Sequence, residues 1–142
     1  MEYIDKKYLE NTFILLGKTG NGKSTACKAL TGNNNIKISS SFKSCTQNIA
    51  YYPGNFGKFC FTVVDTPGLD DSDGRDYEIY QNLRGMLQTK QMKIKGLFIF
   101  CNFMGNRVGN SERKIIEKII NLVPIKKLWK YITIIVTHTL SK

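Results

Sequence analysis

One run of eight residues carries the clearest chemistry in this sequence. Residues 17–24, Gly-Lys-Thr-Gly-Asn-Gly-Lys-Ser, match the pattern GxxxxGK[ST]. The glycines let the backbone curl so that successive N–H groups face an anion, and a helix beginning near Lys23 adds its positive end. We expect Lys23 to reach the β- and γ-phosphates of a nucleotide and the Ser24 hydroxyl to bind Mg²⁺. The predicted phosphate-binding residues are Gly17, Lys18, Thr19, Gly20, Asn21, Gly22, Lys23, Ser24 and Thr25.

A second motif follows at a suitable distance. Asp65-Thr66-Pro67-Gly68 comes directly after the apolar run 62–64. An aspartate at the carboxyl end of a buried strand, beside a phosphate-binding loop, can hold Mg²⁺ through water. The N–H of Gly68 can approach the γ-phosphate because glycine permits close backbone contact. An aspartate that caps a turn is the alternative interpretation. The DxPG pattern separates GTPases from most ATPases with such a loop.

The elements that must position these motifs alternate between strand and helix. Short apolar runs predict strands, and segments with helical periodicity lie between them. A hairpin is expected across residues 53–55, Pro-Gly-Asn, and isoleucines from Ile115 to Ile120 form the inner stripe of the last helix. This order predicts a mostly parallel sheet with helices on both faces. The expected strands are 12–16, 47–52, 58–65, 96–101 and 131–136, and the expected helices are 23–30, 77–87 and 111–122.

Length and composition exclude several classes of protein. The 142 residues are 42% hydrophobic and 23% charged, which fits one folded domain and not a disordered chain. No apolar run is long enough to span a membrane, and no secretory signal begins the chain. The single histidine disfavours a serine-type triad or a His-rich metal site. The cysteines, Cys27, Cys45, Cys60 and Cys101, are too scattered for a CxxC pair, so we expect a cytoplasmic protein.

The positive charge is concentrated in the second part of the chain. Of the net charge of +10, residues 86–142 supply +9, with eleven basic and two acidic side chains. Such asymmetry can indicate a nucleic-acid or anionic membrane surface. A solvated basic face is the interpretation we favour, because the lysines are scattered and no RNA-binding aromatic motif accompanies them. Nucleic acid is therefore not the expected partner.

Taken together, the motifs make the sequence resemble the AIG/GIMAP family of GTPases, whose relatives include septins and Toc receptors of the chloroplast envelope. The matching segments are residues 15–24, 44–46, 65–69 and 103–107, with Thr137-His138 after the last strand. The resemblance implies an α/β fold: a P-loop NTPase with three α/β/α layers and one antiparallel strand in a mostly parallel sheet. It also implies that residues 1–142 form an AIG-type G domain that is incomplete after the fifth strand, which predicts exposed apolar surface.

The same resemblance implies roles for residues outside the phosphate loop. Thr46 occupies the place of the switch-I threonine, which contacts Mg²⁺ and the γ-phosphate. Residues 36–46 and 69–76 would be the two switches. Arg107 lies where relatives place an arginine near a GTP-dependent dimer contact, and it would act on phosphoryl charge in trans or tie two protomers together. An exposed loop arginine is the alternative.

Two positions depart from the usual GTPase pattern. Leu69 stands where Ras-like enzymes carry the glutamine that orients the attacking water, so intrinsic hydrolysis should be slow. Leu140 replaces the aspartate that reads guanine, as in Toc-type relatives. His138 would then contact the base, although a satisfied surface histidine is an equal alternative. The preference for guanine over adenine therefore depends mainly on the resemblance.

The sequence thus predicts a GTP/GDP-binding protein with Mg²⁺ that hydrolyses GTP slowly and works as a conformational or assembly switch. Lys23, Thr46 and Arg107 are the candidate catalytic residues, and Ser24, Thr46 and Asp65 are the candidate metal ligands. A GTP-dependent homodimer or oligomer is the expected partner, and peripheral membrane association is left open. A non-hydrolysing dimerisation or scaffold module is the main alternative, followed by an ATP-binding protein and by nucleic-acid binding.

Overall fold

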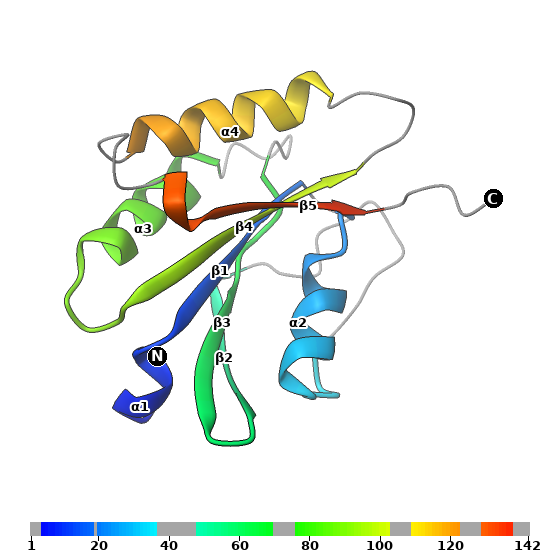
Figure 1. The fold of residues 1–142 in the computed structure, drawn as a ribbon. Coiled ribbons are helices and arrows are strands. Elements are labelled where there is room, and N and C mark those ends of the chain that lie inside the picture. The colour runs from blue at the N-terminus through cyan, green and yellow to red at the C-terminus, as the bar shows by residue number, and fades with distance from the viewer. Residues whose placement is uncertain are drawn as a thin grey trace.

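A central sheet with helices on both faces organises the computed structural model (Figure 1). The structure describes residues 4–18, 20–36, 48–69, 76–102, 109–122 and 129–137. In chain order the elements are α1 (Lys6–Leu9), β1 (Thr12–Gly17), α2 (Lys23–Thr31), β2 (Ala50–Phe56), β3 (Phe59–Asp65), α3 (Asp76–Gln88), β4 (Ile94–Asn102), α4 (Asn110–Leu122), the 3₁₀ helix η1 (Trp129–Tyr131) and β5 (Ile132–Thr137). Within these ranges, no helix is both long and apolar enough to cross a bilayer.

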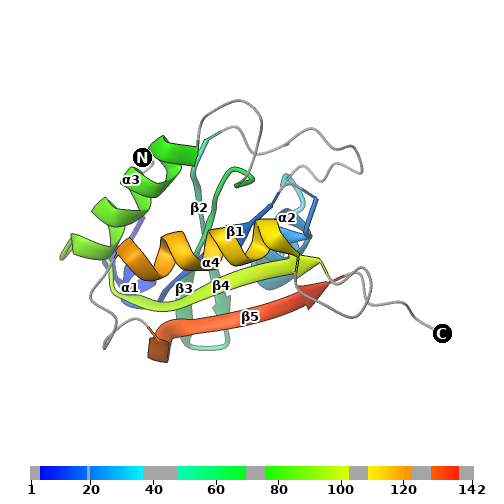
Figure 2. The ribbon, with the colours of Figure 1, turned by 90° about the horizontal axis from the view of Figure 1, so that it is seen from above.

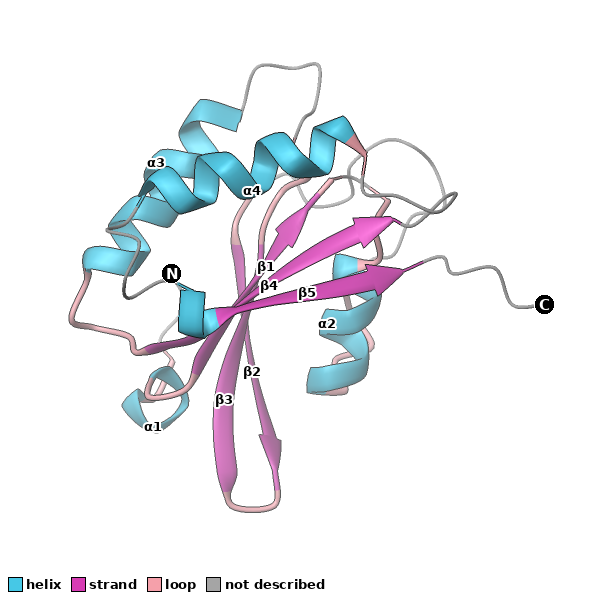
Figure 3. Cartoon of the chain, turned by 45° about the horizontal axis from the view of Figure 1, so that its top comes forward, coloured by secondary structure: helices cyan, strands magenta, loops and turns pink. Residues whose placement is uncertain are grey.

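The sheet order is β2-β3-β1-β4-β5. Strand β1 pairs in parallel with β3 and β4, and β4 pairs in parallel with β5, whereas β2 is antiparallel to β3. This confirms the predicted mostly parallel sheet with one antiparallel strand. Figure 3 shows the arrowheads of β1, β4 and β5 pointing toward the side on which α2 lies. Loops that follow these strands therefore meet at one edge of the sheet, where ligands bind in open α/β sheets.

Alternating side chains of β1 supply two separate cores. Ile14 and Leu16 are fully buried against α3 and α4, in a cluster that includes Ile119. Leu15 points to the other face and packs with Cys27 of α2. Figures 1 and 2 show the layers: α3 and α4 lie over one face of the sheet, and α2 lies on the other. This two-sided burial explains why the strand reads as a continuous apolar run.

The predicted hairpin exists, but its turn is not where the sequence placed it. Residues Pro53 and Gly54 lie inside β2, and the chain reverses at Gly57, whose φ of +56° is in the left-handed region. Pro53 is tolerated because β2 is the edge strand, where a missing N–H breaks no ladder. Gly54 is required by packing, since a Cβ there would lie 2.7 Å from the ring of Phe61. The Pro-Gly pair thus marks an edge strand under an aromatic ring.

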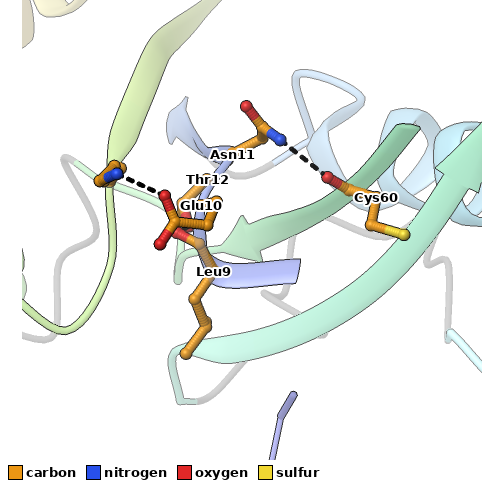
Figure 4. Close-up of polar contacts among 6 residues, drawn as sticks. Leu9, Glu10, Asn11, Thr12 and Cys60 are labelled. Atoms are coloured by element: carbon orange, nitrogen blue, oxygen red, sulfur yellow. Dashed lines mark hydrogen bonds and ion pairs between the residues drawn. The ribbon is translucent and has the colours of Figure 1, made fainter. Parts of the chain in front are cut away.

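Two side chains that precede β1 hold the start of this strand against its neighbours (Figure 4). The Asn11 side-chain amide donates a 3.0 Å hydrogen bond to the carbonyl oxygen of Cys60 at the start of β3. Beside it Glu10 forms an ion pair with Lys93, at the start of β4. The hydrogen bond from Lys93 holds the pKa of the exposed Glu10 below its ordinary value. Both contacts tie β1 to its neighbours, at the end of the sheet away from the glycine-rich loop.

An apolar groove of about 150 Å³ lies on the α2 face, next to the hairpin. Phe56 and Phe59, near the hairpin turn, are 61% and 46% exposed. On the edge strand β5, Ile134 and Val136 are also exposed. Exposed apolar side chains therefore lie both at the hairpin and on β5. The groove is lined by Phe13, Leu30, Phe56, Phe59, Phe61, Val63 and Phe98.

Candidate functional site

The glycine-rich loop is closed around the side chain of Lys23. This lysine is 6% exposed, and its Nζ donates hydrogen bonds of 2.8 Å to the carbonyl oxygens of Gly17 and Lys18. An ammonium group has three N–H donors, so these two contacts leave one for an anionic oxygen. The lysine therefore places a positive charge inside the loop that joins β1 to α2.

Burial lowers the pKa of Lys23 to about 8, and the nearby Asp65 carboxylate opposes this shift. Removal from water disfavours the charged ammonium, whereas a negative charge favours it. An anionic phosphate at the loop would act in the same direction as Asp65. A bound polyphosphate would therefore stabilise the charged form of Lys23.

Three glycines give the loop its shape. Gly17, Gly20 and Gly22 have φ values of +149°, +83° and +89°, which side chains rarely adopt. A Cβ on Gly17 would lie only 2.6 Å from the carbonyl oxygen of Phe100, whereas one on Gly20 would meet nothing within 4 Å. Gly17 is therefore required by the neighbouring strand β4 as well as by its own backbone, and Gly20 faces open space.

The first turn of α2 supplies further donors. Gly22 occupies the N-cap position of α2, so no side chain at that position caps the helix. The first N–H groups of a helix have no partner within the helix and carry partial positive charge. A helix that begins on a glycine inside such a loop can therefore bind an anion through its backbone.

Ser24 and Asp65 meet beside this helix end. The Ser24 hydroxyl donates a 2.8 Å hydrogen bond to Oδ2 of Asp65, whose side chain is buried. A hydroxyl and a carboxylate are the hard oxygen ligands that Mg²⁺ prefers, and Mg²⁺ keeps several of its positions for water and phosphate. The donor set therefore fits Mg²⁺. Across the described ranges no three His, Cys, Asp or Glu side chains gather, so these residues form no closed metal cage.

The DxPG segment is attached directly to the glycine-rich loop. The Leu69 N–H donates a 2.9 Å hydrogen bond to the Gly17 carbonyl oxygen, and the Thr66 hydroxyl donates a 2.7 Å bond to the Leu15 carbonyl oxygen. Leu69 is 1% exposed and belongs to the core shared with α3 and α4. Its side chain is thus a packing group, and it offers no polar atom to a water molecule.

Two residues tie the loop to the neighbouring strands, and sequence reasoning missed this. Asn21 is 3% exposed, and its side-chain amide donates a 3.0 Å hydrogen bond to the carbonyl oxygen of Phe100 in β4. The Thr137 hydroxyl, at the end of β5, lies 3.0 Å from the carbonyl oxygen of Asn21. The contacts span 79 and 116 positions in the sequence. The position of Thr137, directly before the expected base-contacting histidine, was the available signal.

The remaining predicted site residues divide into two groups. Thr25 is exposed on the first turn of α2, and Gly68 is buried near the loop. Thr19, Thr46, Arg107 and His138 lie outside the described residues, as do residues 37–46 and 70–75 of the expected switches. The structure therefore brings together Gly17, Asn21, Lys23, Ser24 and Asp65, and the roles of the others stay predictions.

Known proteins resemble this chain over most of its length. GTP-binding protein A of Dictyostelium discoideum is 26% identical over 132 residues, covering 93% of this chain and 29% of that protein. Translocase of chloroplast 33 of Arabidopsis thaliana is 23% identical over 127 residues, covering 89% of this chain and 41% of that protein. Immune-associated nucleotide-binding protein 13, also from Arabidopsis thaliana, is 29% identical over 106 residues, covering 73% and 31%. The chain thus spans less than half the length of these relatives.

Solved structures agree on the fold. The crystal structure of Toc33 from Arabidopsis thaliana in complex with GDP and Mg²⁺ matches with a TM-score of 0.71 and 23% identity, over 94% of this chain and 52% of that one. The Toc33 complex with Mg²⁺ and GMPPNP matches with a TM-score of 0.72 and 22% identity, with the same coverage. The family model of the AIG1 family covers residues 11–141. The two motifs, the sheet order and this match lead to one conclusion: the chain belongs to the AIG1 family.

Proposed function

We propose that this chain binds GTP and GDP together with Mg²⁺ and changes conformation with the state of the nucleotide. The observation that carries the proposal is the buried Lys23 ammonium, held by two loop carbonyls at the start of α2. Burial of an ammonium costs free energy unless an anion compensates it. Asp65 compensates only part of this cost, since the pKa of Lys23 is still lowered to about 8, and a bound phosphate would offset more of it. The relatives' nucleotide complexes support guanine and Mg²⁺.

In this proposal each residue has a defined task. Lys23 contacts the β- and γ-phosphates, and the N–H groups of the loop and of the first turn of α2 surround the phosphate oxygens. Ser24 and Asp65 hold Mg²⁺, which neutralises phosphate charge when bound. Thr46 and Gly68 contact the γ-phosphate side, and His138 contacts the base. The loops that carry Thr46 and Gly68 would then respond to loss of the γ-phosphate.

Hydrolysis in this proposal is slow. Leu69 is buried in the core, so it cannot orient a water molecule as a glutamine does. Arg107 would stabilise phosphoryl charge from a second protomer. Among the matching Toc33 structures, one is of a dimerization-deficient mutant and another concerns dimerization and GTPase activity. They support a contact between two protomers as the site at which Arg107 would act.

A non-hydrolysing GTP-dependent assembly module is the second candidate. The buried Leu69 is the observation in its favour, because nothing at that position activates water. Phosphate release and molar mass, measured together with GTP and with GDP, separate the two candidates. Assembly with GTP and no release of phosphate would establish the scaffold module and exclude the enzyme.

The central test is a titration of fluorescent GDP and GTP, with and without Mg²⁺, on the wild type and on Lys23→Ala. Loss of a charge-assisted phosphate contact should weaken affinity by about 2–4 kcal/mol. Lys28→Ala is the matched control, since Lys28 lies in the same helix but is half-exposed and should bind nucleotide as the wild type does. Competition with ATP tests the base. Equal affinity of the wild type and Lys23→Ala would refute the proposal.

A further inference from the structure

Two exposed phenylalanines lie at the turn of the β2–β3 hairpin. Phe56 and Phe59 form the last pair of the β2–β3 ladder, and both rings stack on the ring of Phe61, with centroids 5.2 and 6.0 Å away. Lys58, in the turn between them, is also exposed. Exposed apolar surface that is bordered by polar groups often marks a site of interaction. The hairpin turn therefore offers two aromatic rings and a cation to a partner.

A cluster of lysines lies on the segments next to the hairpin. The hydrogen bond from Lys93 lowers the pKa of Glu10. The positive charges that lower it further are those of Lys93, Lys6 and Lys95, all of them exposed. Asp5, the N-cap of α1, has the exposed Lys7 two positions away, and their charges cancel. Three lysines thus face the one carboxylate of Glu10, which leaves an excess of two positive charges.

Hydrogen bonds from two strands bring α1 and its lysines next to the hairpin. The Asn11 amide binds the carbonyl oxygen of Cys60, the neighbour of Phe59 in the chain. The Thr62 hydroxyl donates a 3.0 Å hydrogen bond to the carbonyl oxygen of Tyr8 in α1. Figure 1 shows α1 and the hairpin turn toward the same end of the sheet, with the start of α2 toward the other. The aromatic rings and the lysines therefore share the end that is away from the glycine-rich loop.

The composition of this end indicates the kind of partner. The described residues of α1, of the hairpin turn and of the start of β4 contain lysines and no arginine. Lysine is depleted in interfaces between proteins, because its strongly hydrated ammonium resists removal from water. A lipid headgroup stays hydrated, whereas an aromatic ring beside it can enter the boundary with the acyl chains. The groove beside the rings is lined only by apolar side chains, so it offers no hydrogen bond to a nucleobase.

We propose that this end of the molecule, formed by Phe56, Phe59, Lys58, Lys6 and Lys95, binds the surface of a bilayer that contains anionic phospholipids. The two rings enter the boundary between headgroups and acyl chains, and the lysines contact headgroup phosphates. Because the glycine-rich loop lies at the other end, it faces away from the bilayer. Binding should therefore be equal with and without GDP, and it should weaken as salt screens the lysines.

The test is co-sedimentation with vesicles of phosphatidylcholine, alone or with phosphatidylserine added. The wild type should bind the anionic vesicles about tenfold more strongly than the neutral ones. Lys58→Gln combined with Lys95→Gln should lose about tenfold on the anionic vesicles, because two cations near the surface are removed. Phe56→Ser combined with Phe59→Ser should lose about tenfold on both kinds of vesicle, because the apolar contact is removed.

Two double variants are the matched controls. Ile134→Ser with Val136→Ser removes two exposed apolar side chains from β5, and Lys114→Gln with Lys118→Gln removes two exposed lysines from α4. Both should bind vesicles as the wild type does. Circular dichroism gives the folded fraction, to which each affinity is normalised. The lysine variants change only exposed side chains, so they test the proposal even if the phenylalanine variant unfolds.

Three outcomes would overturn the proposal. The first is equal binding of the wild type to neutral and anionic vesicles, or the same loss in the controls as in the hairpin variants. The second is a phenylalanine variant that is less stable but binds vesicles as the wild type does, since the rings would then serve packing alone. The third is binding of a single-stranded RNA that requires Phe56 and Phe59, without binding of vesicles, which would assign this end to nucleic acid.

Discussion

The Ser24 hydroxyl donates a 2.8 Å hydrogen bond to the Asp65 carboxylate, and this links the first turn of α2 to the last residue of β3. The two residues come from separate motifs that lie 41 positions apart. They meet because β3 is the parallel neighbour of β1, which leads into the loop before α2. Two oxygen ligands suited to Mg²⁺ thus lie next to the lysine expected to hold phosphate.

Removal of the Ser24 hydroxyl should reduce the effect of Mg²⁺ on nucleotide affinity. In the wild type we expect Mg²⁺ to strengthen GDP binding, and in Ser24→Ala this gain should fall about tenfold, since one of two protein ligands is lost. Affinity without Mg²⁺ should change little. Thr133→Ala removes an exposed hydroxyl of β5, away from the proposed Mg²⁺ ligands, and should match the wild type. The same Mg²⁺ gain in Ser24→Ala would show that Ser24 is not a ligand.

Nucleotide affinity should fall as the pH rises above about 8. The pKa of Lys23 is lowered to about 8 by burial in the free protein, and phosphate must raise it because the charged form contacts the anion. Above pH 8 binding therefore takes up a proton, and affinity should drop by up to about tenfold per pH unit. Below pH 8 Lys23 is already charged and the curve should be flat. GDP titrations between about pH 7 and 9.5 measure this.

Lys23→Ala is the control for the pH profile. It should bind weakly and show no fall above about pH 8, because the titrating group is gone. The stability of the protein should also respond to the titration of Lys23, in the opposite direction. The lowered pKa means that the unfolded chain binds more protons than the folded one between about pH 8 and the ordinary value of 10.5. The contribution of Lys23 to stability therefore rises across that window. A wild-type affinity that stays constant to about pH 9.5 would contradict this account.

Local signals predicted much of the fold. The apolar run at the start of β1 and the glycine at its end define a buried strand and a loop. Gly32, with a φ of +68°, caps α2, which ends one residue beyond the expected range 23–30. In α4 the isoleucine stripe is buried as expected, at Ile115 and Ile119. These features succeed because each depends on residues within one or two turns of one another.

Contacts between distant strands were not predictable in the same way. Pro53 and Gly54 have the composition of a turn, but the strand order places them at an edge under the ring of Phe61, and no local pattern reports that order. The hydrogen bond between Asn21 and Phe100 likewise depends on how β1 and β4 align. Leu69 was interpreted by its effect on hydrolysis, whereas its burial follows from packing against α3 and α4. The tertiary structure, and no local sequence pattern, determines the place of the hairpin turn, the hydrogen bond of Asn21 and the burial of Leu69.

A side chain at Gly17 should disrupt the loop. Gly17→Ala puts a Cβ about 2.6 Å from the carbonyl oxygen of Phe100, at a φ of +149° that alanine rarely adopts. The neighbouring atom is backbone of a buried strand and cannot move aside, so we expect a loss of about 2–4 kcal/mol in the free energy of unfolding and a loss of GDP binding. Urea denaturation measures the first quantity. A variant as stable as the wild type would show that the close approach to β4 is not a constraint.

Gly85 offers the opposite case. It lies on the exposed side of α3, where a Cβ would meet nothing within 4 Å. Alanine has the higher helix propensity and loses less backbone entropy on folding, so Gly85→Ala should stabilise the protein by about 0.5–1 kcal/mol and raise its Tm by about 2–4 °C. Gly57→Ala is the matched control, because it also meets nothing within 4 Å but has a φ of +56° in the hairpin turn. The left-handed conformation should make Gly57→Ala about 1 kcal/mol less stable than the wild type. If both variants shifted Tm in the same direction, free space rather than backbone conformation would decide the cost at these two sites.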